Sequence, residues 1–261
     1  MSSLSRISGL VPDKLFVAAI ARAHRRFEPE LGRIVGCYPG GGSVLDVGAW
    51  YGPWTYWLAR RARRVLAFEP NPEVASVLEK CVPGNVTIRR AAASDRTGEA
   101  VLALPGGGRG TEGRASLEGL EDSTRNVSVQ TLRIDDLDLD ALDLADLLMI
   151  KIDVEGHERA ALAGSKEILE RHHPLLVVEI EERHGGIDPT VDLLAGLGYH
   201  GQVLVRGGWV SLDHFDLKAH QAETLPAAAQ GGGYLQIAAR GGMHYINNVV
   251  FTHAETSWDV R

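Results

Sequence analysis

The sequence lacks the features that mark membrane, disulfide-rich and nucleic-acid-binding proteins. No apolar stretch reaches the length of a membrane span, and the first residues lack the apolar core of a signal peptide, so we expect a cytoplasmic protein with no membrane partner. The two cysteines, Cys37 and Cys81, lie far apart without metal-ligand spacing, which suits reduced thiols. A net charge of −7, with no extended run of lysine or arginine, argues against nucleic acid as the main partner.

The pattern of the remaining residues is typical of an α/β protein. A chain of 261 residues fits one such domain with additions. Short apolar runs alternate with helical segments, which predicts a parallel sheet with right-handed crossovers. The clearest helical patterns cover residues 12–36, with a break at Pro29, and residues 159–171.

The same pattern divides the chain into two parts. We expect residues 1–40 to form a helical N-terminal segment, a candidate lid, and residues 41–261 to form the α/β domain. An insertion interrupts the alternation at about 96–134. A glycine-rich stretch at about 206–246 predicts an irregular segment that contacts substrate.

The stretch VLDVGAWYG is the most informative motif. Its apolar run ends in a turn that carries Gly48 and Gly52, and the next apolar run ends in Glu69. Such a loop admits a nucleoside, and such an acid holds ribose hydroxyls. A dinucleotide site needs three glycines, whereas Trp50 would crowd a pyrophosphate and Asp46 would repel one. Asp46 suits a sulfonium or an α-amino group better, so the motif favours S-adenosylmethionine over NAD.

A second motif, KIDVEGHE, places acids where an apolar strand ends. Asp153 and Glu155 follow this strand, and Glu179 ends the next one. If the two strands are neighbours, Asp153 and Glu179 converge at one edge of the sheet, where ligands of α/β proteins bind. These acids could serve as a general base, as an anchor for a hydroxyl group or as ligands of a divalent metal, and the sequence leaves all three roles open. Lys151, inside the apolar strand, predicts either a salt bridge to an acid or a substrate contact.

These motifs, together with FEPNP and AASD, resemble the FkbM family of S-adenosylmethionine-dependent methyltransferases over roughly residues 44–182. Members typically show D-x-G-A-N-x-G, then F-E-P, then K-I-D-V-E-G-x-E. Trp50 stands where the family usually has Asn. The resemblance implies the class I methyltransferase Rossmann-like fold, a seven-stranded, mostly parallel sheet with helices on both faces. It also implies O-methylation, often of sugars or polyketides.

The resemblance further implies which residues bind the cofactor. Those expected at its methionine end are Asp46, Gly48, Ala49, Gly52 and Thr55. Glu69 is expected to bind the ribose hydroxyls, and Ser94 and Asp95 to lie near adenine. We expect Trp50 to close over the methionine end or over the acceptor, in place of an Asn contact.

An alcohol is the expected acceptor, because the motif for methylation of base amino groups, an acid or Asn followed by Pro-Pro-aromatic, is replaced by DVEG. The candidate bases are Asp153, Glu155 and His157. Alternatively, magnesium bound by Asp153 and Glu179 would lower the pKa of the hydroxyl. A saccharide suits the polar and aromatic residues near the expected pocket, which are Trp50, Tyr51, Trp54, Trp209, His244, Tyr245, Asn247 and Asn248.

Other functions stay open at this point. A NAD- or nucleotide-sugar-linked α/β enzyme would use a similar fold, a polyketide or another non-sugar alcohol would suit similar chemistry, and a non-catalytic module would keep only the pocket. Among saccharides, a mannoside precursor of a mycobacterial methylated polysaccharide agrees with a composition typical of a GC-rich genome. A homodimer is a candidate assembly.

Overall fold

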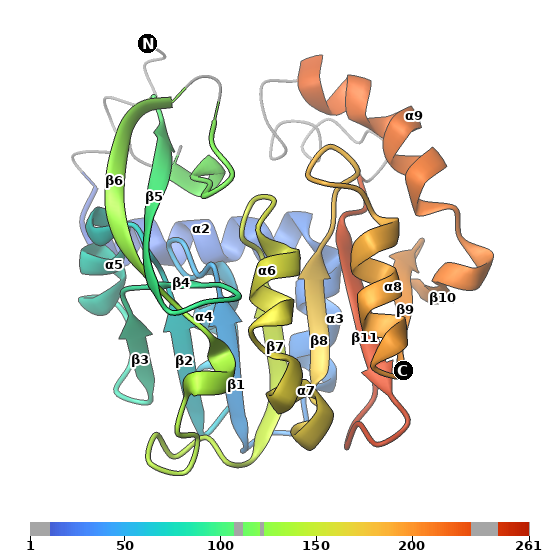
Figure 1. Ribbon diagram of the computed structural model, residues 1–261, viewed down its shortest axis with the longest axis horizontal. Coiled ribbons are helices and arrows are strands. Elements are labelled where there is room, and N and C mark those ends of the chain that lie inside the picture. Colours follow the sequence, from blue (N-terminus) through green and yellow to red (C-terminus); the bar gives the residue numbers. More distant parts are fainter. Residues whose placement is uncertain (1–10, 107–111, 121–122, 231–244, 261) are drawn as a thin grey trace.

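The computed structural model describes residues 11–106, 112–120, 123–230 and 245–260. Its main sheet is built from strands β1 (Ser43–Val47), β2 (Arg64–Phe68), β3 (Val86–Arg89), β7 (Leu147–Ile152), β8 (Leu175–Glu179), β9 (Tyr199–Val205), β10 (Gly208–Ser211) and β11 (Asn248–His253). Within the described residues these eight strands lie in the order β10-β9-β11-β8-β7-β1-β2-β3 (Figure 1). The five strands from β8 to β3 are mutually parallel, and β11 runs antiparallel to both β8 and β9.

The sheet confirms the expected fold class but has one strand more than the seven expected. The extra strand, β10, pairs antiparallel with β9. Arg206 and Gly207 connect the two strands with φ of 49° and 86°, as a two-residue hairpin turn of type I′ requires. The expectation of an irregular segment at 206–246 was therefore wrong at its start. It was also wrong at α9 (Leu217–Gln230), while residues 231–244 lie outside the described part of the chain.

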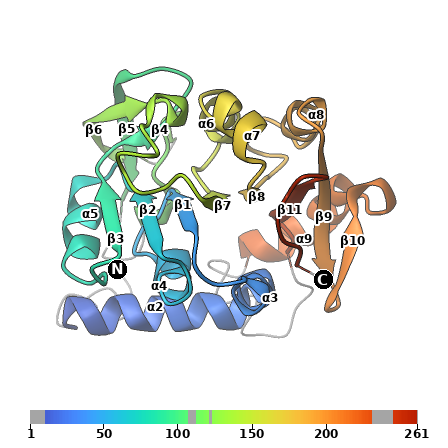
Figure 2. The same ribbon diagram turned by 90° about the horizontal axis from the view of Figure 1, so that it is seen from below.

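Helices cover both faces of the sheet (Figure 2). One face carries α2 (Asp13–Phe27), α3 (Pro29–Cys37), α4 (Pro53–Leu58) and α5 (Pro72–Glu79), and the other carries α6 (Glu158–Ala163), α7 (Lys166–His172) and α8 (Asp188–Gly196). Pro29 begins α3, because proline has no N–H to donate and is favoured at a first helical position. In the described residues no helix is both long and apolar enough to cross a bilayer.

The central strands are apolar because both of their faces are buried. Leu45 and Val47 of β1 pack into the hydrophobic cluster on one face, and Val44 packs into the cluster on the other. This is the pattern expected for parallel strands covered by helices. Asp46 and Lys151 interrupt this apolar pattern, since both side chains are buried and ionisable. They mark the edge of the sheet at which the candidate site lies.

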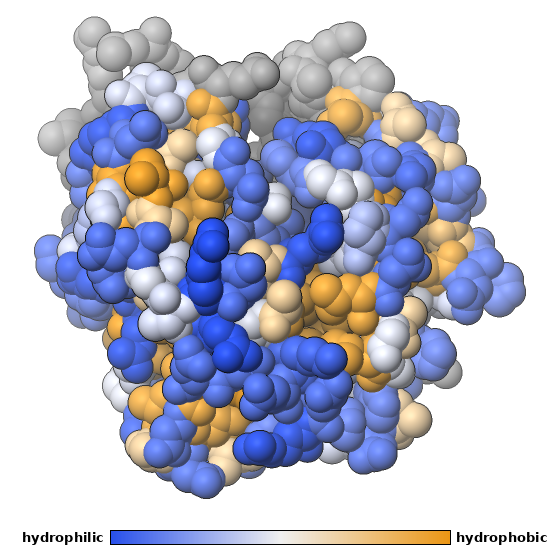
Figure 3. All heavy atoms as spheres, in the orientation of Figure 1, coloured by the Kyte–Doolittle hydropathy of each residue, from blue (hydrophilic) through white to orange (hydrophobic). Residues whose placement is uncertain are grey.

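The insertion forms a small second sheet beside the main one. Its strands are β4 (Ala92–Ala93), β5 (Gly98–Pro105) and β6 (Ser123–Leu132), in the order β4-β6-β5. A short 3₁₀ helix, η1 (Glu112–Arg114), follows β5, and residues 107–111 lie outside the described part. Apolar side chains gather over this region at the upper left of Figure 3, and Val101 on β5 is 57% exposed.

Gly164, between α6 and α7, gives a test of how tightly the second face is packed. A Cβ at this position would overlap the carbonyl oxygen of Ser94, whereas a Cβ at Gly36 in α3 would meet no atom within 4 Å. Gly164→Ala should therefore lower the free energy of unfolding by at least about 2 kcal/mol. Gly36→Ala should leave it unchanged or raise it by about 0.5–1 kcal/mol. Urea unfolding measures both, and equal stability of the two variants would contradict this packing.

Candidate active site

A cavity lies at the carboxyl ends of the parallel strands. The main sheet and the loops that follow its strands, together with the short strand β4, contribute Gly48, Trp50, Phe68, Glu69, Pro70, Ala91, Ala92, Ala93, Asp153, Val154, Glu155 and His157 to its lining. The insertion completes the wall with Leu102, Glu112, Gly113, Ala115 and Leu117. The turn after β1, the ends of β2 and β7 and the insertion therefore meet at one place, the edge at which α/β proteins bind ligands.

Glu69, directly after β2, is the buried acid of this cavity. Its carboxylate accepts hydrogen bonds from the backbone N–H of Trp50 at 2.7 Å and of Asn71 at 2.8 Å. Burial nevertheless raises the pKa of Glu69 to about 7. The carboxylate is fixed by two amides and half protonated near neutral pH.

The turn after β1 approaches β7 very closely. Gly48 has a φ of 82°, and a Cβ there would overlap the carbonyl oxygen of Asp153. The N–H groups of Gly48 and Ala49 both donate to the carbonyl of Phe68, at 3.1 and 2.8 Å. Only glycine allows this approach, which brings the turn, Glu69 and Asp153 around one space.

Trp50 lines the cavity from this turn. Its φ of 48° lies in the left-handed region, which Asn tolerates well and Trp rarely adopts. The indole packs edge-on against His24 of α2, with ring centroids 5.6 Å apart, and lies beside Gly113 of the insertion. Its buried N–H has no hydrogen-bond partner in the described part of the chain. Trp50 therefore joins the N-terminal helix and the insertion at the cavity wall.

Four other residues expected at the methionine end lie outside the cavity lining. Asp46 is buried beneath the turn, and the hydroxyl of Thr55 donates to its carboxylate. Burial raises the pKa of Asp46 to about 6. Ala49 packs into the hydrophobic core, and Gly52, with a φ of 72°, precedes α4. These four residues therefore lie behind the cavity lining and do not form part of it.

Lys151 lies at the centre of an acidic cluster beside the cavity. Its buried ammonium is 3.4 Å from the carboxylate of Asp153. Glu179, at the end of the neighbouring strand, accepts a hydrogen bond from the Asn247 amide. Burial, and then the charge of Asp153, raise the pKa of Glu179 well above its usual value. Since β7 and β8 are adjacent, Asp153 and Glu179 converge as expected, and the ammonium group of Lys151 lies beside them.

This donor set does not support magnesium at Asp153 and Glu179. Magnesium prefers an octahedral shell of oxygen ligands, whereas here Asp153 is already paired with Lys151 and Glu179, with its raised pKa, already accepts a hydrogen bond from Asn247. Of the two roles expected for Lys151, a salt bridge or a substrate contact, the structure shows the salt bridge, with Asp153.

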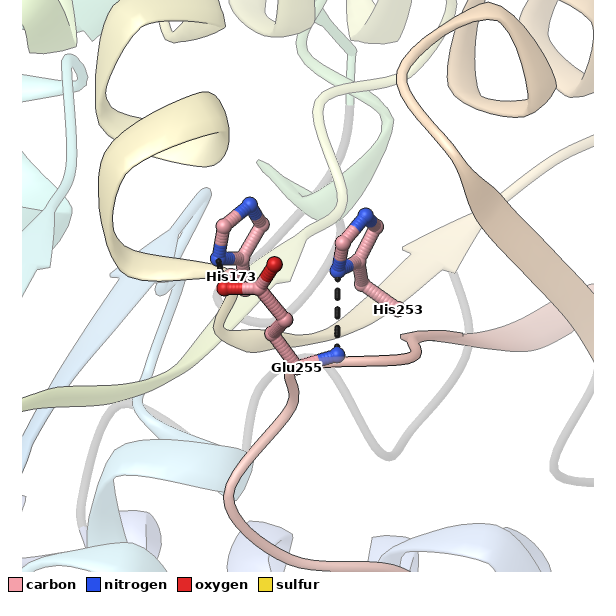
Figure 4. A group of neighbouring side chains, drawn as sticks. All are labelled: His173, His253 and Glu255. Carbon is pink, nitrogen blue, oxygen red and sulfur yellow. Dashed lines mark hydrogen bonds and ion pairs between the residues drawn. The ribbon is translucent and has the colours of Figure 1, made fainter.

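Metal-ligand spacing occurs elsewhere in the described chain, at His173, His253 and Glu255 (Figure 4). His173 precedes β8 and His253 ends the antiparallel β11, so this cluster lies at the opposite edge of the sheet from the cavity. The two imidazole rings stack at 4.1 Å with an angle of 11° between their planes. Nδ1 of His253 accepts a hydrogen bond from the backbone N–H of Glu255 at 3.1 Å. Parallel rings direct their lone pairs along separate planes, so the cluster is not arranged to hold one ion.

The other two candidate bases, Glu155 and His157, are less suited to accept a proton. Burial, and next the charge of Asp153, raise the pKa of Glu155 to about 8, so this side chain is mostly neutral at pH 7. Nδ1 of His157 lies 2.6 Å from the carboxylate of Glu118, and Nε2 lies 3.0 Å from the hydroxyl of Ser94. Of the three, Asp153 alone lines the cavity with its carboxylate paired to a cation.

Several residues expected near adenine or the acceptor lie away from the cavity lining. Ser94 and Asp95 do not line the cavity; Ala91, Ala92 and Ala93 lie there instead. The Trp54 side chain is buried in the core, and the indole N–H of Trp209 donates to the carbonyl of Val260, so neither faces the cavity. His244 lies outside the described residues.

Sequence reasoning missed the contribution of the insertion and of His24. No periodicity connects residues 112–117 to lining residues that are distant in the sequence, such as Glu69 and Asp153, so their place in the wall had no local signal. His24 forms an ion pair with Glu28. Burial lowers the pKa of His24, but the hydrogen bond and charge of Glu28 outweigh burial and raise it.

The fold and this cavity together define a class I methyltransferase architecture: a parallel sheet whose first turn and second strand enclose a pocket with a buried acid. The methyltransferase FkbM domain profile matches residues 46–203, more than half of the chain. The chain belongs to the FkbM methyltransferase family.

Solved structures similar to this chain share low identity with it. Methyltransferase FkbM from Methylobacillus flagellatus KT is 18% identical, with a TM-score of 0.45, and the match covers 66% of this chain and 42% of that one. This chain therefore spans about two fifths of the length of that protein. A Streptococcus mutans protein in complex with SAH is 9% identical, with a TM-score of 0.42, and the match covers 86% and 96% of the two chains. No curated protein matches the sequence.

The raised pKa of Glu155 predicts how stability depends on pH. The folded state keeps a proton on this carboxyl up to about pH 8, whereas the unfolded state loses it near the usual value of 4.5. The stability that this proton confers is complete below the unfolded pKa and is lost as pH rises through about 8. Wild type should therefore become less stable between pH 6 and pH 8.5, and Glu155→Gln should show a smaller decline.

Urea unfolding at the two pH values measures this difference, with Glu223→Gln as an exposed control. An equal decline in Glu155→Gln and wild type would show that Glu155 does not carry the effect.

Proposed function

We propose that the protein is an S-adenosylmethionine-dependent O-methyltransferase that acts on a hydroxyl of a small molecule, with a saccharide as the favoured acceptor. The observation that carries this proposal is the single cavity that joins the glycine turn and Glu69 to Asp153 and Glu155. One end of it suits a nucleoside, and the other end holds groups able to activate a hydroxyl.

The lining fits S-adenosylmethionine. Glu69 offers carboxylate oxygens to ribose hydroxyls, and the apolar walls formed by Ala91–Ala93, Leu102 and Leu117 suit a flat adenine ring. The buried N–H of Trp50 is a free donor at the same cavity. Several carboxyl groups around the space suit a sulfonium ion. The cofactor, when bound, supplies an electrophilic methyl group.

Asp153 is the proposed general base. Asp153 lines the cavity, and its carboxylate would accept the hydroxyl proton as the acceptor oxygen bonds to the methyl carbon and the carbon–sulfur bond breaks, which leaves S-adenosylhomocysteine. Lys151 holds this carboxylate in place through the 3.4 Å ion pair. Glu155, neutral at pH 7, donates a hydrogen bond that orients the acceptor. His157 positions the loop through Ser94 and Glu118 rather than taking the proton.

A saccharide acceptor agrees with the polar surroundings of this edge. Asn247 and Asn248 lie at the start of β11 beside Glu179, and the side-chain oxygen of Asn248 has no partner among the described atoms. Amides and carboxylates of this kind bind sugar hydroxyls. A mannoside precursor of a methylated polysaccharide is one candidate, and a polyketide alcohol is the non-sugar alternative. We propose a cytoplasmic enzyme in which α2 and the insertion form the lids of the cavity.

Binding of S-adenosylhomocysteine separates this function from a NAD-linked enzyme. S-adenosylhomocysteine should raise the thermal unfolding temperature, and NAD should not. Its affinity should increase as pH rises through about 7, because Glu69 accepts ribose hydrogen bonds as a carboxylate. Glu69→Gln should bind more weakly and show little pH dependence. Stabilisation by NAD alone would overturn the proposal.

The role of Asp153 is tested with methyl-labelled S-adenosylmethionine and a panel of saccharide acceptors. Asp153→Asn should reduce turnover at least about 100-fold, the size of general-base catalysis, while S-adenosylhomocysteine affinity stays near that of wild type. Glu155→Gln, which keeps a hydrogen-bond donor, should lose far less. If Asp153→Asn turned over normally and Glu155→Gln did not, the base would be Glu155.

Magnesium dependence is tested with a chelator. Because Lys151 already supplies the cation, turnover in excess EDTA should equal that in magnesium. Loss of turnover in EDTA, restored by magnesium and not by calcium, would instead support a metal at Asp153 and Glu179.

A further inference from the structure

Exposed arginines gather on the outer side of α2 and at the end of α4. Arg22, Arg25 and Arg26 project from the second half of α2, and Arg60 and Arg61 follow α4. We call these five residues the arginine face. The inner side of α2 buries Val17 and Ala21 against the protein, so helical periodicity directs Arg22 and Arg26 to solvent. Arg25 lies at the border of the two sides and is also exposed. Figure 2 shows α2 as the outermost element on its side of the sheet.

Contacts between α2 and α4 connect the two parts of the arginine face. The indole N–H of Trp57 in α4 donates to the carbonyl of Ala21 in α2 at 2.8 Å, which joins the two helices. The Arg25 guanidinium lies 4.3 Å from the centroid of the Trp57 ring. Arg60 lies 3.6 Å from the centroid of the Tyr56 ring. Stacking on the rings holds these guanidinium groups in place, and Arg60 also donates a hydrogen bond to the carbonyl of Tyr56.

None of the five arginines forms an ion pair with a carboxylate among the described residues. Exposed arginines elsewhere do: Arg90 pairs with Glu79 at 2.6 Å, and Arg125 pairs with Glu73 at 2.8 Å. Residues 13–64 contain nine of the 27 basic residues of the chain and only four of its 34 acidic ones. This stretch of the sequence is therefore net positive, although the whole chain is net negative.

Contrary to the expectation of no membrane partner, we propose that the arginine face docks on an anionic lipid surface. Clusters of four to eight basic residues on an amphipathic helix bind such surfaces, at about 1 kcal/mol for each residue near the membrane. Leu15, which is 63% exposed, lies seven positions before Arg22 and so on the same side of α2. An exposed leucine beside arginines suits the boundary between headgroups and acyl chains.

A nucleic acid fits this face less well. Single-stranded nucleic acids need open aromatic rings on which bases stack. Here guanidinium groups already cover Tyr56 and Trp57, and the N–H of Trp57 is bound to Ala21. An exposed Leu15 also adds nothing to phosphate recognition.

Vesicle flotation tests the proposal. The full chain should float with vesicles of phosphatidylcholine and phosphatidylglycerol in a two-to-one ratio at about 50 mM NaCl, and should dissociate at about 500 mM NaCl, because salt screens the attraction. It should not float with phosphatidylcholine alone. Combined Arg22→Gln, Arg25→Gln and Arg26→Gln should weaken partitioning about tenfold to a hundredfold.

Matched variants complete the test. Combined Arg96→Gln, Arg159→Gln and Arg171→Gln, which removes the same charge from other exposed positions, should float like wild type. Leu15→Ser should weaken vesicle binding severalfold. Equal binding to neutral vesicles, equal loss in both triple variants, or binding to a poly(U) oligonucleotide tighter than to anionic vesicles and unaffected by Leu15→Ser would each overturn the proposal. If a triple variant fails to fold, the salt dependence of wild-type flotation still tests whether the protein binds anionic vesicles by electrostatic attraction.

Discussion

The buried ammonium of Lys151 is the interaction on which the rest of the site depends. Burial lowers its pKa, but the carboxylates of Asp153, Glu179, Glu28 and Asp46 outweigh burial and raise it. These acids belong to different parts of the fold: the end of β7, the end of β8, the end of α2 and β1. A single charge thus holds together an edge of the sheet that would otherwise be crowded with buried negative charge. Removing one member of such a cluster leaves the others without compensation, which is far more costly than removing an exposed ion pair.

The sequence was a good guide to the central sheet and a poorer one to its margins. Buried parallel strands such as β1 and β7 appear as short apolar runs, so their positions were correct. Residues 159–171 had the period of one helix but form α6 and α7, because Gly164 must lie against the backbone of Ser94. The hairpin of β9 and β10 was missed since its turn, Arg206–Gly207, begins with a residue that rarely adopts a positive φ.

The candidate site divides in a similar way. Gly48, Glu69 and Asp153 follow directly from strand ends, and strand order alone brings them together. The wall supplied by Leu102 and Leu117 depends on how the insertion folds back over the sheet, which no local pattern encodes. The ionisation of Glu155 was equally hidden, because it arises from burial and from neighbours that are distant in sequence. Sequence motifs therefore located the chemistry, and tertiary packing determined which groups can perform it.

The raised pKa values of Asp46, Glu69 and Glu155 have a consequence for how the cavity accommodates charge. With pKa values of about 6, 7 and 8, these carboxyl groups hold exchangeable protons close to neutral pH. A cationic ligand that enters favours their ionised forms and so expels protons, and its departure draws protons back. Binding of a cation beside these groups is therefore coupled to the release of protons into the surrounding buffer.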